Sequence, residues 1–493
     1  MQVGAAVRTT GPRRSLREAW VALAGLSAVF LFEMLDNSIL NVALPTIGRE
    51  LSASTTALQW VTGAYAVVFG GSMLAFGALA DRFGRRRLML VGLVLLGAAS
   101  AATAFVSTAE QLIAVRVVLG LAAAMTTPGT MALAFRLFAD DGLRFRATNL
   151  IATVGLVGLA VGPTVGGLVL AVAPWQVLLL VNVPVAVLAV VGVRSGIAPD
   201  DPADLHRDPV DVPGAVLGTA TIVLALVAPT LFVTRGAGSW SPWTVTGAAV
   251  AAALLFVVRQ RTARHPLVDL ALLGRPLVSS GLLYQAAEGL AVAGLVYLVT
   301  LQLQLDWGWP PALAAAGMLP QIVTMLAIGP FVTRIVERAG IGRAAALGAT
   351  AVVAGVAAYA LLNGLGYVSV AVALVLTAAG TRVVGVVASV NVLRGLPADR
   401  TSIGAAINDT STEVTSAIGL AVTGTVLAAL FGGDITRAGW TAAQTAQFHQ
   451  ALTVAVLSLA AAAAVLVGWA FLRAGSAGDD EAVMSVEDAL QEA

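Results

Sequence analysis

The stretch GALADRFGRRR, residues 77–87, closes one apolar segment and opens the next. A glycine in such a position lets two helices approach closely, an aspartate can pair across a tight loop, and arginines favour one side of a membrane. Four arginines alone would fit any loop on the side of a membrane where loops are rich in basic residues. The ordered pattern is more specific, and its residues are Gly77, Asp81, Arg82, Gly84, Arg85 and Arg86.

The chain around this loop has the composition of a polytopic membrane protein. It has 493 residues, of which 58% are hydrophobic and 11% charged, whereas soluble domains carry about 25% charged residues. A spanning helix needs about 20 mostly apolar residues. Fourteen runs meet this need: 18–44, 56–80, 87–106, 110–135, 147–171, 174–194, 212–234, 243–259, 277–303, 312–335, 342–363, 366–393, 402–432 and 449–472. We therefore predict an all-α fold with 14 transmembrane helices.

The arginines predict the orientation of these helices. Of the 28 basic residues, 23 lie in segments on the side that would hold both termini, and three lie on the opposite side. Because basic loops stay in the cytoplasm, both termini are expected to be cytoplasmic. The net charge of +1 gives no indication of nucleic-acid binding.

A second stretch repeats the first one. GPFVTRIVERAGIGR, residues 329–343, ends the tenth run, and both stretches place an arginine (Arg82, Arg334) five residues after a glycine. Two-half repeats are typical of secondary transporters, which bind substrate near the midplane between the halves. The predicted organisation is a cytoplasmic N-terminus, a six-helix bundle, linkers with two inserted helices, a second six-helix bundle and a disordered acidic tail: 1–17, 18–194, 195–276, 277–472 and 473–493.

The loop pattern at 77–87 resembles the signature of the major facilitator superfamily. The resemblance implies two six-helix bundles that rock about a central cavity. It also implies that Asp81 and the neighbouring arginines form an ion-pair latch between helices, which stabilises one face of the transport cycle.

The fourth run contains VRVVLGLAAA, residues 115–124, with Arg116 inside an apolar segment. A charge at the bilayer centre costs about 2.5–3.5 kcal/mol on insertion scales. One alternative is that Arg116 extends to the interface beside Glu110. The segment is similar to the fourth-helix motif of drug antiporters, with Arg116 followed by Gly120, which implies a role for Arg116 in proton coupling.

The fifth run contains TVGLVGLAVGPTVGG, residues 153–167. Its glycines recur every three or four residues and form a face on which another helix can pack closely, and its proline favours a bend. Generic small-residue packing is the alternative explanation. The segment resembles the fifth-helix motif of proton-coupled exporters, and the matching residues are Gly158, Gly162, Pro163, Gly166 and Gly167.

The first run carries two acids in an apolar helix. LDNSILNVALP, residues 35–45, resembles the first-helix motif of the fourteen-helix drug:proton antiporters, with Asp36 and Asn41 as its polar positions. Glu33 lies outside the pattern, and its i, i+3 spacing places it on the same helix face as Asp36. Two close acids do not ionise together easily, which suits groups that bind and release protons. The alternative is an acid pair at the membrane interface.

Three further acids lie in the second half. Asp409 and Glu413 stand one turn apart in a segment similar to the thirteenth helix of the same antiporters, where Glu413 is the matched acid. Glu288 lies within the ninth run and matches no motif. It could line the substrate cavity or form a structural ion pair with Arg382 of the twelfth run.

One segment departs from the family pattern. The sixth run begins PWQVLLLVNVP, residues 174–184, where Trp175 and Asn182 match the pattern and Gln176 and Val177 replace its usual Arg and Trp. The departure indicates a divergent member with a substrate of its own.

Several function classes lack sequence support. The chain has no cysteine, its three histidines fall in loops or at a helix entry, and it has no phosphate-binding GxxxxGK[ST] loop. We therefore expect no enzyme activity, no metal, no cofactor and no ATP, with a proton gradient as the energy source.

Together these features predict a proton-coupled exporter of amphipathic, cationic drugs in a bacterial cytoplasmic membrane. Asp36, Glu413 and Arg116 would couple protons, and Glu33, Asp36, Asn41, Glu288, Asp409 and Glu413 would bind substrate. The expected partners are lipid, protons and a small molecule, and the expected state is a monomer. The alternatives are a dedicated exporter of one natural product, a proton symporter for a metabolite, and a membrane scaffold or sensor.

Overall fold

A computed structural model describes residues 15–200, 211–396, 401–432, 435–437 and 439–491, and in these residues the chain is a bundle of long helices. Thirteen helices are long and apolar enough to cross a membrane. A further pair of segments within one bent helix, 55–73 and 75–83, makes fourteen. The predicted all-α membrane fold is confirmed, and the protein is a multi-pass membrane protein.

The first half of the bundle, here called the N-half, contains six spans. Side-chain caps begin several of them: Ser54 accepts a hydrogen bond from the backbone N–H of Ala57, and Asp140 accepts one from Leu143. The helices are α1 (Trp20–Glu50), α2 (Thr55–Phe83), α3 (Arg85–Ala102), α4 (Ala109–Arg136), α5 (Asp141–Leu170) and the broken span of α6 (Gln176–Leu180) and α7 (Asn182–Gly196).

An inserted pair and a second six-span half follow, as predicted. The inserted helices pack on each other, and the first of them, α8, packs against α2 and α16, beside the junction of the halves. The helices are α8 (Val212–Arg235) and α9 (Trp240–Thr262), the short α10 (Leu270–Gly274), and then the C-half: α11 (Pro276–Leu301), α12 (Pro311–Gly317), α13 (Leu319–Ala339), α14 (Ile341–Leu362), α15 (Tyr367–Arg394), α16 (Thr401–Leu430) and α17 (Ala442–Gln491).

The sequence repeat corresponds to equivalent turns in the two halves. Gly84 (φ 103°) joins α2 to α3, and Gly340 (φ 78°) joins α13 to α14. Both glycines adopt positive φ, which residues with a Cβ disfavour. The second and third helices of each half therefore meet at a turn of the same kind.

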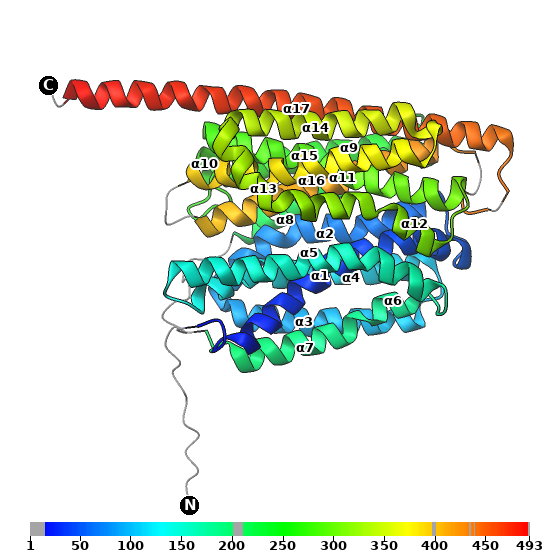
Figure 1. Ribbon diagram of the computed structural model, residues 1–493, viewed down its shortest axis with the longest axis horizontal. Helices are drawn as coiled ribbons and strands as arrows, with labels where there is room; N and C mark the ends of the chain where they lie inside the picture. Colours follow the sequence, from blue (N-terminus) through cyan, green and yellow to red (C-terminus); the bar gives the residue numbers. More distant parts are fainter. Residues whose placement is uncertain (1–14, 201–210, 397–400, 433–434, 438, 492–493) are drawn as a thin grey trace, which may run out of the picture.

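Both ends of the described chain lie at one end of the bundle, on the left in Figure 1, which we call the terminal end. Short helices α6 and α12 lie at the opposite end, the far end. Helix α17 continues to Gln491, so residues 473–491 are helical where the sequence predicted a disordered tail. Ala, Glu, Leu and Met in this segment favour helix.

Candidate functional site

Asp36 of α1 is bonded within the N-half. Its carboxylate forms an ion pair with Arg116 of α4, and both side chains have no exposed surface. Asn182, the first residue of α7, donates a hydrogen bond from Nδ2 to Asp36 Oδ1 at 3.0 Å. Arg116 also donates from Nε to the Val61 carbonyl at 3.1 Å and lies 4.4 Å from the centre of the Tyr65 ring.

This geometry removes one sequence alternative, because Arg116 does not reach the membrane interface. Its charge is neutralised by Asp36 and by the face of an aromatic ring. The cluster still leaves three buried atoms without a hydrogen-bond partner: Arg116 Nη2, Asn182 Oδ1 and the Tyr65 hydroxyl. A buried pair of this kind is costly to break, since either partner alone is an uncompensated charge.

Glu33 lies one turn before Asp36 and has a different environment. It is buried, and the Thr127 hydroxyl donates a hydrogen bond to its Oε2 at 2.9 Å. The acids that act on it electrostatically are Glu413 and Asp409 of the C-half. The two acids of α1 therefore have different surroundings: Asp36 is paired within its own half, whereas Glu33, which is hydrogen-bonded in that half, also lies within electrostatic reach of the acids of the C-half.

Helix α16 supplies the opposing acids. A Cβ at Gly70 of α2 would lie 3.1 Å from the Glu413 Cβ, so the halves approach closely at this height. Asp409 lies one turn nearer the terminal end. It is deep within the protein, yet much of its side chain is exposed, as expected for the wall of an open cavity.

The halves are joined at the far end. Gln59 of α2 donates to the Ala421 carbonyl of α16 at 3.1 Å, and Gln304 donates to the Val42 carbonyl of α1 at 2.9 Å. Gln59 also lies 3.5 Å from the Thr425 hydroxyl of α16, so these two glutamines link the N-half to the C-half at this end. The halves are thus held together at the far end, whereas Asp409, which is nearer the terminal end, is exposed.

The predicted site residues fall into two groups. Glu33, Asp409 and Glu413 come together across the halves, whereas Asp36 and Arg116 lie inside the N-half. Asn41 is half-buried on α1, beside the far-end contact. Glu288 of α11 is apart from both groups, and no ion pair joins it to Arg382 in the described part of the chain.

The glycine face of α5 packs against α1, a partner that the sequence did not identify. A Cβ at Gly158 would lie 2.7 Å from Leu31 Cδ1, and one at Gly162 would overlap Ser38 Oγ. Gly166 has more room, with Ile39 atoms at 3.6 Å. Gly167 instead contacts the C-half, where its Cβ would lie 2.6 Å from Ala312 Cα.

The loop at 77–87 forms an ion pair within itself. Asp81 Oδ1 accepts from Arg85 Nε at 2.8 Å. A second acid, Asp200, joins the neighbouring helices: it accepts from the Arg86 and Arg87 backbone N–H groups at 3.3 and 3.2 Å, and from Arg136 Nη1 at 3.1 Å. Arg86 in turn donates to the Arg194 carbonyl.

Several of these partners were missed from sequence. Thr127, Tyr65 and Asp200 had no motif to mark them, and Asn182 was noted only as a pattern residue. Asp200 belongs to a polar linker more than 110 residues after the N-terminus of α3, and only the folded structure brings its carboxylate to those N–H groups. Thr127 follows another threonine in an apolar helix, which gives no signal of its partner.

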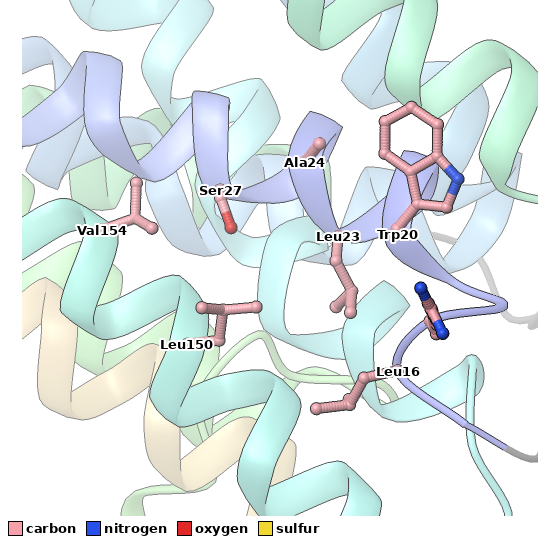
Figure 2. Close-up of a pocket in the computed structure, with 8 residues that line it drawn as sticks. Leu16, Trp20, Leu23, Ala24, Ser27, Leu150 and Val154 are labelled. Atoms are coloured by element: carbon pink, nitrogen blue, oxygen red, sulfur yellow. The ribbon is translucent and has the colours of Figure 1, made fainter.

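Two hollows lie near the terminal end, and the side chains that line them do not include the acids. Figure 2 shows one of about 470 Å³ between the starts of α1 and α5, lined by Trp20, Leu23, Leu150 and other mostly apolar side chains. The other, of about 330 Å³, lies between α2, α8, α9 and α16. In the part of the chain that the structure describes, no cluster of acids and histidines could hold a metal ion.

The comparison with protein families decides the family. The model of the Major Facilitator Superfamily matches residues 26–433. The chain belongs to this superfamily.

Three of the relatives are named for drug resistance or efflux. The methyl viologen resistance protein SmvA of Salmonella typhimurium is 30% identical over 84% of each chain. The multidrug efflux pump LfrA of Mycolicibacterium smegmatis is 30% identical over 89% of this chain and 86% of its own. The lincomycin resistance protein of Streptomyces lincolnensis is 32% identical over 67% of this chain and 68% of its own.

Solved structures share the superfamily fold at low sequence identity. A POT family transporter has a TM-score of 0.62 at 15% identity, over 89% of this chain and 94% of its own. The nucleoside transporter NupG has a TM-score of 0.61 at 14% identity, over 92% of this chain and 99% of its own. These likenesses concern the fold alone.

Proposed function

We propose that this member of the superfamily exports cationic, amphipathic drug-like compounds across a bacterial cytoplasmic membrane in exchange for protons. The observation that carries the proposal is the group of three acids: Asp409 and Glu413 of α16 act electrostatically on Glu33 of α1, in the opposite half. Relatives named for resistance to methyl viologen and for multidrug efflux support the class of substrate.

The distribution of the arginines supports export as the direction of transport. With 23 of 28 arginines on the side of the termini, the terminal end is the cytoplasmic end. The present conformation then opens to the cytoplasm and is closed outside by Gln59 and Gln304. A compound would meet Asp409 first, since it is the most accessible acid, and then Glu413 and Glu33 one turn deeper.

Coupling follows from competition for the same oxygens. Three carboxylates in a space of low dielectric repel one another, so either protons or a cation must compensate them. A cation that arrives from the cytoplasm displaces protons, and protons that arrive from outside displace the cation. Because the acids belong to both halves, a bound cation also draws the halves together.

The buried ion pair of Asp36 and Arg116 gives the transport cycle a second proton-dependent step. A proton on Asp36 removes the charge that holds Arg116, and the freed guanidinium still has the Val61 carbonyl and the Tyr65 ring. Since α1 carries Asp36 and Glu33 one turn apart, a change at the pair moves the helix that bears the substrate acid. The transporter works as a monomer, without a bound cofactor, on the proton gradient.

The test uses inverted membrane vesicles with an acid interior and a fluorescent reporter of the pH gradient. We expect several cations, methyl viologen among them, to discharge the gradient in the wild-type protein and not in Glu413→Gln, while neutral analogues have no effect. If only one compound on a broad panel acts, the protein is a dedicated exporter. If no compound acts in wild-type vesicles at any gradient, the proposal is refuted.

A further inference from the structure

Glu288 occupies the place in the C-half that Asp36 occupies in the N-half. The repeated glycines Gly77 and Gly329 set the register: Asp36 precedes Gly77 by 41 residues, and Glu288 precedes Gly329 by 41 residues. Each acid lies on the first helix of its half, α1 or α11. Repeats within a transporter place equivalent positions at equivalent depths, so Glu288 is the counterpart of Asp36.

The surroundings of the two acids correspond as well. Asp36 contacts the fourth and sixth spans of its half through Arg116 and Asn182. Glu288 lines a small hollow together with side chains of the third, fourth and sixth spans of the C-half, α14, α15 and α17. Its Oε2 lies beside Gly385 of α15, 3.5 Å from where a Cβ would stand.

The fourth span of the C-half also carries an arginine, at a different height. Arg382 belongs to α15, as Arg116 belongs to the equivalent helix α4. The register differs, since Arg116 is the eighth residue of a 28-residue helix and Arg382 the sixteenth of another. Arg382 therefore extends to α13, where its Nη2 lies 3.5 Å from a Cβ built on Gly329.

Asp36 and Arg116 form an ion pair, whereas Glu288 and Arg382 do not. Glu288 Oε2 and Arg382 Nε are both buried without a hydrogen-bond partner. Arg382 nevertheless lies close enough to act electrostatically on Glu288. An ionised carboxylate with a buried, unpartnered oxygen is strongly disfavoured, so the carboxyl group needs either a proton or the guanidinium.

We propose that Glu288 is a second proton-binding site, located in the C-half, and that Arg382 replaces the proton in the alternate conformation. The hollow itself adds only apolar groups from α14 and α17. Other charged or titratable groups occur on the helices of this region: Tyr284, which also lines the hollow, and Tyr297 on α11, Arg343 and Tyr359 on α14, Asp409 and Glu413 on α16, His449 and Arg473 on α17, and Glu33 and Asp36 on α1. Of the charged groups, Arg382 is the one that acts electrostatically on Glu288. Arg382 is therefore the partner in reach.

The test is an infrared pH titration of the purified protein, which detects protonated carboxyl groups directly and needs no transport. We expect the carboxyl C=O band of the wild type to lose intensity as the pH rises. In Glu288→Gln, the intensity lost should be smaller by the contribution of one carboxyl group. Glu337→Gln, at an exposed position of α13, should keep the full band. Glu288→Asp, which retains a carboxyl group, should restore it.

Identical difference spectra for the wild type and Glu288→Gln would overturn the proposal. If Glu288→Gln does not fold, Glu288→Asp decides, because a carbonyl band moved by the shorter side chain supports the site and an unmoved band contradicts it. The inference rests on the proposed function only where it takes the proton at Glu288 to participate in transport. Wild-type vesicles without proton-linked transport would refute that function, and this titration would still report whether Glu288 binds a proton.

Discussion

The buried pair of Asp36 and Arg116 gives the sharpest stability prediction. In Asp36→Asn, Arg116 keeps the Val61 carbonyl and the Tyr65 ring but loses its counter-charge. Breaking a buried pair by removing one partner costs about 3–5 kcal/mol. We expect a loss of this size in the free energy of unfolding, together with loss of proton-linked transport.

Glu33→Gln is the matched control on the same helix. Its hydrogen bond from Thr127 can still be accepted by the amide oxygen, and the nearby acids lose a like charge. The expected cost is below about 1 kcal/mol, the value of one ordinary hydrogen bond. The two positions lie one helical turn apart, and each variant replaces one carboxylate oxygen by an amide nitrogen. The difference between their free energies of unfolding therefore isolates the ion pair.

The double variant Asp36→Asn with Arg116→Gln completes the cycle. Removing both charges leaves no uncompensated ion, so most of the lost stability should return, with a coupling of about 2–3 kcal/mol. Transport should stay lost, because no acid remains at the pair. The assay is denaturant unfolding of purified protein in detergent. Equal stability of Asp36→Asn and Glu33→Gln would refute the reasoning.

Three further predictions concern packing, the loop and the substrate acids. Gly162→Leu should abolish transport because α1 leaves no space for its side chain, whereas Gly166→Ala should transport normally; equal vesicle activity of the two would contradict the packing argument. Asp81→Ala should lower the turnover rate at least severalfold with little change in substrate affinity, and an unchanged rate would exclude the latch. Glu413→Gln should weaken binding of dications more than of monocations in a detergent binding assay, and equal losses would count against paired acids.

The fold was largely predictable because membrane helices can be recognised in a sequence from the length and hydropathy of its apolar runs. The fourteen runs, the six–two–six organisation and the glycine face at Gly158 and Gly162 all follow from local sequence. The helical extension of α17 was missed, since the polar residues after 472 carry no hydropathy signal. Their helix-favouring composition was the available clue.

The candidate site was only partly predictable. The i, i+3 spacing placed Glu33 and Asp36 on one helix face, but it gave no sign that one acid would face the other half and the other its own. That division depends on what α4 and α7 present, namely Thr127, Arg116 and Asn182. Contacts between residues 80, 94 and 146 positions apart in the chain leave no trace in a local pattern.

The central claim is that protons and cations compete for the same carboxyl groups. The most direct measurement adds a cationic substrate to purified protein in weakly buffered detergent and follows the pH. The account predicts that protons are released on binding in the wild type, and that fewer are released in Glu33→Gln and Glu413→Gln. Saturable binding of the cation without any proton release would contradict it.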